Sequence, residues 1–266
     1  MRLSQVAIVS LALTSAFAAF GQARAKTPAK APPRAAPHAP QAYHQAMVGW
    51  HAPIGKRAPI DGAGRPMLVL QSINRSERVE LAAQTDAGGF AAHDLDRAAW
   101  VLRSGSGDEH PVEPRTLDII YRIQTHFQAA AIRIVSGYRV PKPTSHSNHG
   151  KGRAIDFIVP GTPDADVAKF AREIGFVGVG IYPTSQFVHV DVRPRSYFWI
   201  DYSGPGKKNR ERGILPELAA ASDKRATERG ERGIEPFGIG SDVDLALKAR
   251  GPVPATTGDD DEDDGD

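Results

Sequence analysis

The sequence predicts an α+β protein in which helices pack on a small, mostly antiparallel sheet, with disordered segments on both sides of the folded domain. Two observations predict this fold class. Short stretches whose apolar residues alternate, as in strands, are interleaved with stretches whose apolar residues recur at helical spacing. These patterns are confined to residues 61–205, which is enough chain for one domain with its own core.

The first half of this domain is expected to hold a β-hairpin followed by two helices. Residues 67–73 and 77–84 have strand patterns, and the turn Asn74-Arg75-Ser76 joins them. A short helix is expected over 94–103. A longer helix is expected over 114–128, where apolar residues form a stripe that faces the core.

The second half is expected to complete the sheet. The predicted elements are strands over 131–136 and 153–159, a helix over 163–174, and a closing antiparallel pair over 177–182 and 186–192. Successive side chains of a strand point to opposite faces. Asp156 is therefore expected on one face of its strand, and His189 and Asp191 on the same face of the last strand.

The chain on either side of this domain has the composition of export and linker segments. Residues 1–25 fit a secretory signal peptide, in which an apolar stretch precedes a small-residue cleavage site at Ala23-Arg24-Ala25. Residues 26–60 are predicted to be a Pro/Ala-rich linker, and residues 206–266 a charged, largely disordered C-terminal tail. We therefore expect a periplasmic or otherwise exported protein with no stable membrane span after signal cleavage.

Composition excludes several kinds of site. The chain has no cysteine, which excludes a thiol-anchored lipoprotein, a disulfide-stapled scaffold, a cysteine nucleophile and a thiolate metal site. The formal net charge is +2, but acidic residues gather at the C-terminal end and leave the remainder basic, which suits contact with anionic polymers. No motif indicates nucleic-acid binding or a particular oligomeric state.

His149, Asp156 and His189 are the strongest candidates for a functional site. Two imidazoles and one carboxylate suit Zn²⁺ and leave a fourth position open for water, as catalytic zinc sites require. If the strands that carry Asp156 and His189 are neighbours, the two side chains can converge. His149 would reach them from the preceding loop, where Gly150 and Gly152 permit a tight turn.

This region resembles a known family of enzymes. Ser136-Gly137-Tyr138-Arg139, the pattern S-x-H-x-x-G-x-A-x-D ending at Asp156, and F-V-H-V-D ending at Asp191 resemble the zinc peptidases of bacterial cell-wall metabolism. That family includes D-Ala-D-Ala carboxypeptidases and murein endopeptidase K-like proteins, and the resemblance covers about residues 66–200. It implies a D-Ala-D-Ala peptidase/hedgehog-like fold and peptidoglycan as the substrate.

The resemblance also implies roles for individual residues. His149, Asp156 and His189 would be the zinc ligands, and Arg139 and Ser147 would contact the substrate or the ligands. Arg139 is predicted to be catalytic and substrate-binding by pairing with a substrate carboxylate, and its alternative role is a salt bridge that fixes the loop.

The general base departs from the family pattern. Several relatives have an acid or a histidine two or three residues before the last ligand, where this chain has Gln186 and Phe187. Asp191 is the predicted replacement as catalytic base. Its alternative role is to accept the other N–H of His189, as zinc ligands commonly require. His146 is a third candidate for the base.

The leading functional hypothesis is an exported zinc metallopeptidase that hydrolyses peptidoglycan through a zinc-activated water. It would act either as a cross-link endopeptidase or as a stem-peptide carboxypeptidase. The alternative is a non-catalytic, zinc-containing cell-wall-binding domain, which the missing acid before His189 favours. The aromatic residues after the last ligand are expected to cap the core or to line a substrate cleft: Tyr197, Phe198, Trp199 and Tyr202.

Overall fold

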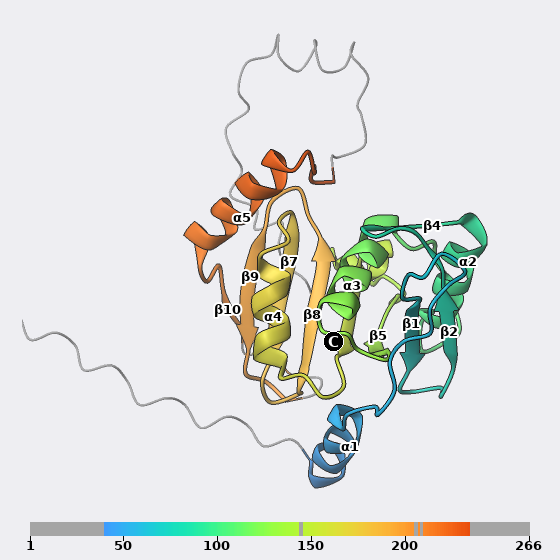
Figure 1. Ribbon diagram of the computed structural model, residues 1–266. Helices are drawn as coiled ribbons and strands as arrows, with labels where there is room; N and C mark the ends of the chain where they lie inside the picture. The colour runs from blue at the N-terminus through green and yellow to red at the C-terminus, as the bar shows by residue number, and fades with distance from the viewer. Residues whose placement is uncertain (1–39, 144–145, 205–206, 208–209, 235–266) are drawn as a thin grey trace, which may run out of the picture. The chain divides into compact units, whose positions relative to one another are not determined.

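A computed structural model describes residues 40–143, 146–204, 207 and 210–234 (Figure 1). The predicted signal peptide, the first part of the predicted linker and the acidic end of the tail lie outside these residues. None of the helices in the described ranges combines the length and the apolar character that a membrane span requires.

The described chain contains five α-helices, one short 3₁₀ helix and ten strands. The helices are α1 Gln41–His51, α2 Ala92–Val101, α3 Pro114–His126, η1 Asn148–Lys151, α4 Asp164–Arg172 and α5 Pro216–Glu228. The strands are β1 Leu68–Ser72, β2 Arg78–Leu81, β3 Ala83–Thr85, β4 Gly88–Phe90, β5 Ile132–Ser136, β6 Ala154–Ile158, β7 Val177–Tyr182, β8 Phe187–Val192, β9 Tyr197–Asp201 and β10 Arg210–Arg212.

Eight of the strands form one mixed sheet in the order β10-β9-β7-β8-β6-β5-β1-β2. β1 pairs with β5, and β7 with β9, in parallel, and the other neighbours are antiparallel. The α+β prediction is confirmed, but the sheet is not the small one predicted: it has eight strands and is mixed, since two of its seven strand pairings are parallel. The sequence pattern did not predict β9 because its residues form an almost continuous apolar run without strand alternation. A strand that pairs in parallel also needs no hairpin turn, so the sequence holds no turn signal next to it.

The apolar core lies between the sheet and the helices α3 and α4. Figure 1 shows α4 lying across β7 and β8, and both helices contact the sheet. α3 turns a stripe of buried residues to the core, as its helical spacing predicted. From the sheet, Ile155 and Phe157 of β6 and Val188 and Val190 of β8 enter the same core. The opposite face of these two strands carries Asp156 and His189, so packing of the core fixes the strands that hold the candidate site.

Helix α1 lies inside the range predicted as a linker. The Tyr43 hydroxyl donates a 2.7 Å hydrogen bond to the Ser185 carbonyl, and Met47 is fully buried. Arg133 of β5 donates to the carbonyls of Gly49 and Trp50. The sequence pattern missed α1 because it buries only one large apolar side chain, so that tertiary hydrogen bonds hold it more than an apolar face does.

Helix α5 lies inside the range predicted as a disordered tail. It buries only small residues, Ala219, Ser222 and Ala226, which give little apolar periodicity in the sequence. Its Asp223 accepts hydrogen bonds from the backbone N–H groups of Phe176, at 2.6 Å, and Ser196, at 2.8 Å. The described residues on both flanks of 61–205 therefore pack on the domain.

Candidate active site

The candidate site is built on a row of residues that crosses five neighbouring strands. Asp156 of β6 pairs directly with His189 of β8, which pairs on its other side with Gly180 of β7. The row continues to Ser136 of β5 in one direction and to Trp199 of β9 in the other. Paired residues of neighbouring strands share a face, so one strand pairing is enough to bring Asp156 and His189 together.

His149 joins this pair from the 3₁₀ helix η1. The Ser147 hydroxyl caps this helix by accepting a 3.3 Å hydrogen bond from the His149 backbone N–H. Gly152 ends it at φ +64°, and a Cβ there would lie 2.1 Å from the Pro111 carbonyl oxygen. A side chain at position 152 would therefore strain the backbone and collide with the neighbouring loop.

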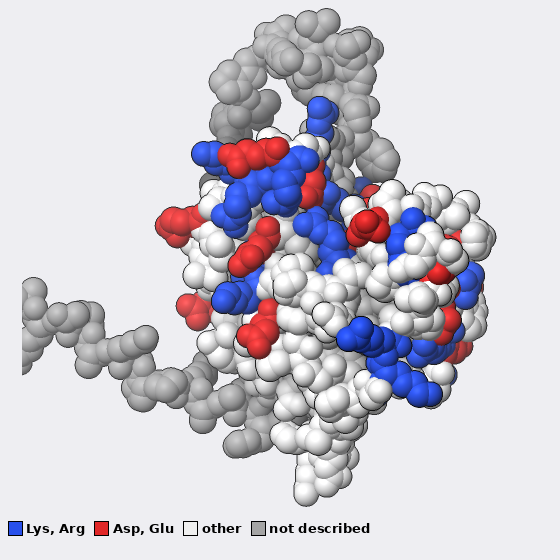
Figure 2. Space-filling model, in the orientation of Figure 1, with Lys and Arg blue, Asp and Glu red and all other residues white. Residues whose placement is uncertain are grey.

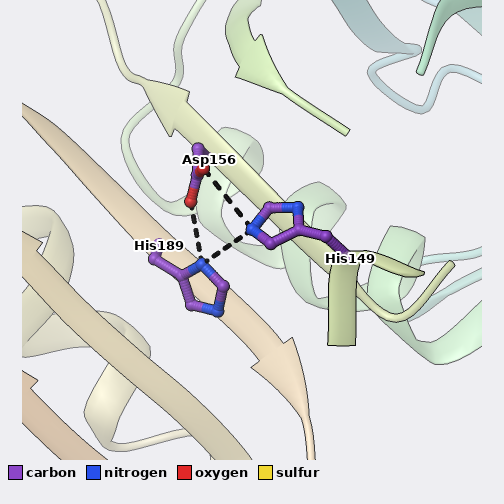
Figure 3. A group of neighbouring side chains, drawn as sticks. All are labelled: His149, Asp156 and His189. Carbon is purple, nitrogen blue, oxygen red and sulfur yellow. Dashed lines mark hydrogen bonds and ion pairs between the residues drawn. The ribbon is translucent and has the colours of Figure 1, made fainter. Parts of the chain in front are cut away.

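The three side chains turn one ligand atom each toward a common point (Figure 3). His149 Nε2 lies 3.2 Å from His189 Nδ1 and 3.4 Å from Asp156 Oδ2, and His189 Nδ1 lies 2.8 Å from Asp156 Oδ1. A tetrahedral zinc with ligand bonds of about 2.0–2.1 Å needs ligand atoms about 3.3 Å apart. The separations of 3.2 and 3.4 Å match this requirement, and the 2.8 Å contact between His189 and Asp156 would have to open by about 0.5 Å for the cluster to hold a metal ion of zinc's size.

Each of the two histidines is held from its outer side. His149 Nδ1 lies 2.7 Å from the Gly137 carbonyl oxygen, which can only accept, so that Nδ1 carries the proton and Nε2 presents its lone pair to the cluster. His189 Nε2 lies 2.9 Å from Asp191 Oδ2, on the ring edge opposite the cluster. Such outer contacts fix the ring orientation that metal ligation requires.

Asp191 is the most enclosed carboxylate of the site. Arg193 donates to both of its oxygens, at 2.7 and 3.0 Å, and the Gly178 N–H donates to Oδ1 at 3.1 Å. Only 1% of Asp191 is exposed. Both oxygens are therefore occupied by contacts that lie on the far side of His189 from the cluster.

Arg139 provides the outer contact of Asp156, the third residue of the cluster. Its guanidinium pairs with Asp156 Oδ2, and its Nε donates a 2.9 Å hydrogen bond to the Ser136 hydroxyl. The side chain of Arg139 is 29% exposed, whereas that of Asp156 is buried. Arg139 therefore connects the buried cluster to the solvent-accessible surface.

These contacts set the protonation states of the cluster. Burial alone would lower the pKa of His189, but hydrogen bonds to Asp156 and Asp191 outweigh it and raise the pKa to about 9. Burial and the charge of Arg139 lower the pKa of His149. Burial opposes ionisation of Asp156 and Asp191, yet neighbouring cationic groups hold the pKa of each carboxyl below its usual range. Both carboxylates are therefore ionised at neutral pH.

Arg193 was not predicted as a site residue, and Trp199 was expected only as one of four aromatic residues that cap the core or line a substrate cleft. Arg193 holds Asp191, and the indole of Trp199 lies beside the His189 ring at 5.0 Å between centroids. Both need space above β7, since a Cβ on Gly180 would lie 2.4 Å from the Trp199 ring and a Cβ on Gly178 would lie 2.3 Å from Asp191. The two alternate glycines of this strand were the available signal, because glycine inside a strand often marks a close approach.

The other predicted residues lie at different distances from the cluster. His146 is exposed. Gln186 lies in the turn before β8, and the ring of Phe187 stacks on Tyr182 at 4.3 Å. Of the aromatic residues after the last ligand, Phe198 is buried in the core and Trp199 covers His189. Phe198 therefore packs in the core, as one expectation had it, and Trp199 lies against the candidate site, whereas the expectation that these aromatic residues line a substrate cleft stays a prediction.

Comparison with known proteins agrees with this geometry. A family model described as peptidoglycan L,D-endopeptidase MepK matches residues 62–197. The chain is 32% identical over 142 residues to the probable peptidoglycan L,D-endopeptidase MepK of Haemophilus influenzae, covering 48% of this chain and 76% of the relative.

Peptidoglycan L,D-endopeptidase MepK of Escherichia coli K12 is 26% identical over 145 residues, which cover 50% of this chain and 79% of the relative. No solved structure matches the chain significantly. The matched residues include all of β1 to β8 and the whole His-Asp-His cluster, and the chain belongs to the MepK family of murein endopeptidase K-like peptidases.

Proposed function

We propose that this protein is an exported zinc peptidase that cleaves L,D-peptide bonds of peptidoglycan cross-links. One observation carries the proposal: three buried side chains turn their ligand atoms toward one point, and each is held in that orientation by a different neighbour. The bond type and the substrate follow the names of the relatives from Haemophilus influenzae and Escherichia coli.

His149, Asp156 and His189 would hold the metal. Nitrogen and carboxylate ligands in this ratio suit zinc among the metals that proteins commonly bind. When bound, zinc would supply a water molecule of lowered pKa and would polarise the scissile carbonyl group. The ionised Asp156 and the fixed Nε2 lone pair of His149 support this role, since both groups are already in the form that ligates.

The remaining residues of the site would position and desolvate the reacting groups. Asp191, itself held by Arg193, would keep the His189 ring turned with Nδ1 toward the cluster. The Trp199 indole would exclude water from the other side of that ring. Preorganised groups of this kind need no rearrangement during the reaction, which is an important source of catalytic power.

We propose that Asp191 orients His189 rather than serving as the general base. A base must lie within hydrogen-bonding reach of the attacking water. Asp191 instead contacts the ring nitrogen of His189 that points away from the cluster, and its two oxygens are bound by Arg193 and the Gly178 N–H. The geometry therefore supports the positioning role of Asp191 better than the role of general base that the sequence predicted.

Arg139 is the group that would meet the substrate. It is the partly exposed member of the site, and its planar guanidinium can bind a carboxylate with two hydrogen bonds. A substrate carboxylate would compete with Asp156 for it. We further propose the cell envelope as the location, on the basis of the predicted signal peptide 1–25 and the substrate of the relatives.

Digestion of purified sacculi tests the proposed function. The full chain is incubated with sacculi, with and without a chelator, and the released muropeptides are read by mass spectrometry. We expect L,D-cross-linked dimers to disappear, the chelator to block this, and added zinc to restore it. Zinc binding without cleavage of any cross-linked or stem substrate would instead favour the non-catalytic wall-binding domain.

A further inference from the structure

A polar cleft lies next to the candidate active site. Its volume is about 440 Å³, within the range of roughly 300–1,000 Å³ that is typical of small-ligand sites. The carboxyl ends of the parallel neighbours β1 and β5 form one side, and the loop after α2 forms the other. The cleft includes Gly137, which contacts His149, and Arg139, which contacts Asp156 and donates to the Ser136 hydroxyl, so it leads directly to the cluster.

The charges that line the cleft all have one sign. Arg75, Arg103 and Arg139 contribute to its lining, and no acidic residue does. Figure 2 shows basic side chains gathered over the end of the β1–β2 hairpin, where Arg75 lies. A concave surface of one charge sign concentrates its field in the cleft and attracts ligands of the opposite sign.

The three arginines differ in how far their charge is already balanced. Arg103 binds both oxygens of Glu77, at 2.7 and 2.8 Å, and Arg139 binds Asp156. Arg75 donates to two backbone carbonyls, those of Arg103 and Ser104, and no carboxylate among the described residues forms an ion pair with it. Its position is therefore fixed by neutral partners, and Glu77, which binds Arg103, interacts with Arg75 only electrostatically and not as an ion pair, so that the Arg75 charge is the least neutralised of the three.

We propose that this cleft binds the part of the substrate beyond the scissile bond, and that Arg75 recognises a free carboxylate on that part. The ligand would be an acidic peptide that enters along β1 and β5 and reaches the cluster past Arg139. This inference rests on the proposed peptidase function, because it assigns the cleft to the same substrate. It adds a second carboxylate contact, at a distance from the metal ligands, which would select peptides that carry a free carboxylate.

Gly105 offers a test that leaves the arginines in place. It lines the cleft, and a Cβ built there meets nothing within 4 Å, so side chains fit without strain. Gly105→Asp adds a negative charge to the cleft, and Gly105→Asn adds nearly the same volume without charge. The probes are a fluorescent peptide with a free C-terminal carboxylate and its carboxamide twin, and binding to the full chain is measured by anisotropy in the presence of a chelator, so that no cleavage occurs.

We expect Gly105→Asp to weaken binding of the carboxylate peptide by about three- to tenfold relative to Gly105→Asn, with a smaller effect on the carboxamide. Equal affinities of the two variants for the carboxylate peptide would overturn the inference. Equal losses for both peptides would overturn it as well, because the added charge would then act without regard to the ligand's carboxylate.

Arg75→Gln provides the second arm, with Arg78→Gln as its matched control. Arg78 lies on β2 outside the cleft lining and pairs with Glu80. We expect Arg75→Gln to remove most of the preference for the carboxylate peptide, about five- to twentyfold, and Arg78→Gln to keep it. If Arg75→Gln does not fold, because Arg75 also holds the loop after α2, the Gly105 pair decides alone.

The two proposals can fail separately. A wild-type chain that prefers the carboxylate peptide but cleaves no peptidoglycan would refute the peptidase function and leave the anion-binding cleft in place. A chain that cleaves cross-links but binds both peptides equally would refute the cleft inference alone.

Discussion

The two faces of β6 and β8 are both largely buried but differ in chemistry. One face presents only apolar side chains to the core, among them Ile155, Phe157, Val188 and Val190. The other face carries all three ionisable residues of these strands, Asp156, His189 and Asp191, beside the apolar Ala154, Ile158 and Phe187. None of the four named core-facing residues and none of the three ionisable residues is more than 2% exposed. Burial alone therefore does not distinguish the core of this domain from its candidate active site.

The difference lies in what each face requires from its neighbours. The apolar face is stabilised by close packing, so it responds to changes in volume. The polar face is stable only because each group has a partner, such as Arg193 for Asp191 and Gly137 for His149. We therefore expect substitutions on the apolar face to lower stability, and substitutions on the polar face to lower metal affinity and activity.

The largest expected effect is on the polar face. His189→Ala removes one of three predicted ligands, and we expect zinc affinity to fall by several orders of magnitude and cleavage to be lost. Circular dichroism should show a folded domain, because the core-facing side chains of β8 are unchanged. Metal analysis of the purified variant checks this. Stoichiometric zinc in His189→Ala would show that the ligands have been assigned wrongly.

The matched change on the apolar face is Ile155→Ala, one residue away from Asp156. Ile155 is 1% exposed in the core, so truncation should destabilise the domain by about 2–5 kcal/mol. Zinc affinity of the folded variant should stay within about twofold of the wild type. Denaturant unfolding and a zinc titration measure the two quantities. If Ile155→Ala instead lost much of its zinc affinity without losing stability, the apolar face would also serve the metal site, and the proposed difference between the two faces would be wrong.

A smaller effect is expected for Asp191→Asn, which keeps the size of the side chain but removes its charge. If Asp191 orients His189, zinc affinity should fall by about 10- to 100-fold, and excess zinc should restore cleavage. If Asp191 is the general base, kcat should fall by about 10² to 10⁴ while zinc stays bound. Muropeptide cleavage across a zinc titration separates the two roles, and failure of zinc to restore activity would refute the positioning role.

The comparison of the two faces also explains what the sequence could predict. Strand alternation places Asp156 and His189 opposite the core-facing residues, so their convergence required only that β6 and β8 be neighbours. Arg193 and Trp199 could not be predicted in the same way. Their contacts depend on a glycine-lined strand between them and on the parallel pairing of β7 with β9, which no local pattern specifies.

The flanking helices α1 and α5 also could not be predicted from local sequence patterns. α1 and α5 are held mainly by individual hydrogen bonds and by small buried residues, and such contacts have no period in the sequence. The range 61–205 therefore captured β1 to β9 and most of the apolar core, but not β10 or the two helices that pack on the domain. Elements of this kind are the least visible to pattern analysis, because tertiary contacts rather than local propensity stabilise them.

The smallest expected effect concerns the attachment of α1. His51, the last residue of α1, lies 3.3 Å from Asp164 at the start of α4, and its ring also contacts the Met47 carbonyl. The hydrogen bond to Asp164 raises the pKa of His51, against the opposing effect of burial. A raised pKa means that the folded state holds the proton more tightly than the unfolded state does.

The contribution of this pair to stability should therefore be complete below the ordinary histidine pKa of about 6.5 and should disappear as the pH rises through the raised pKa of His51. The pair is partly exposed, so we expect less than about 1 kcal/mol. The measurement is the unfolding midpoint of the wild type minus that of His51→Gln, followed from about pH 5.5 to 8.5. This difference should shrink with rising pH, and Asp164→Asn should abolish the trend. A difference that grows with pH would show that the neutral ring, not the ion pair, holds α1 to the domain.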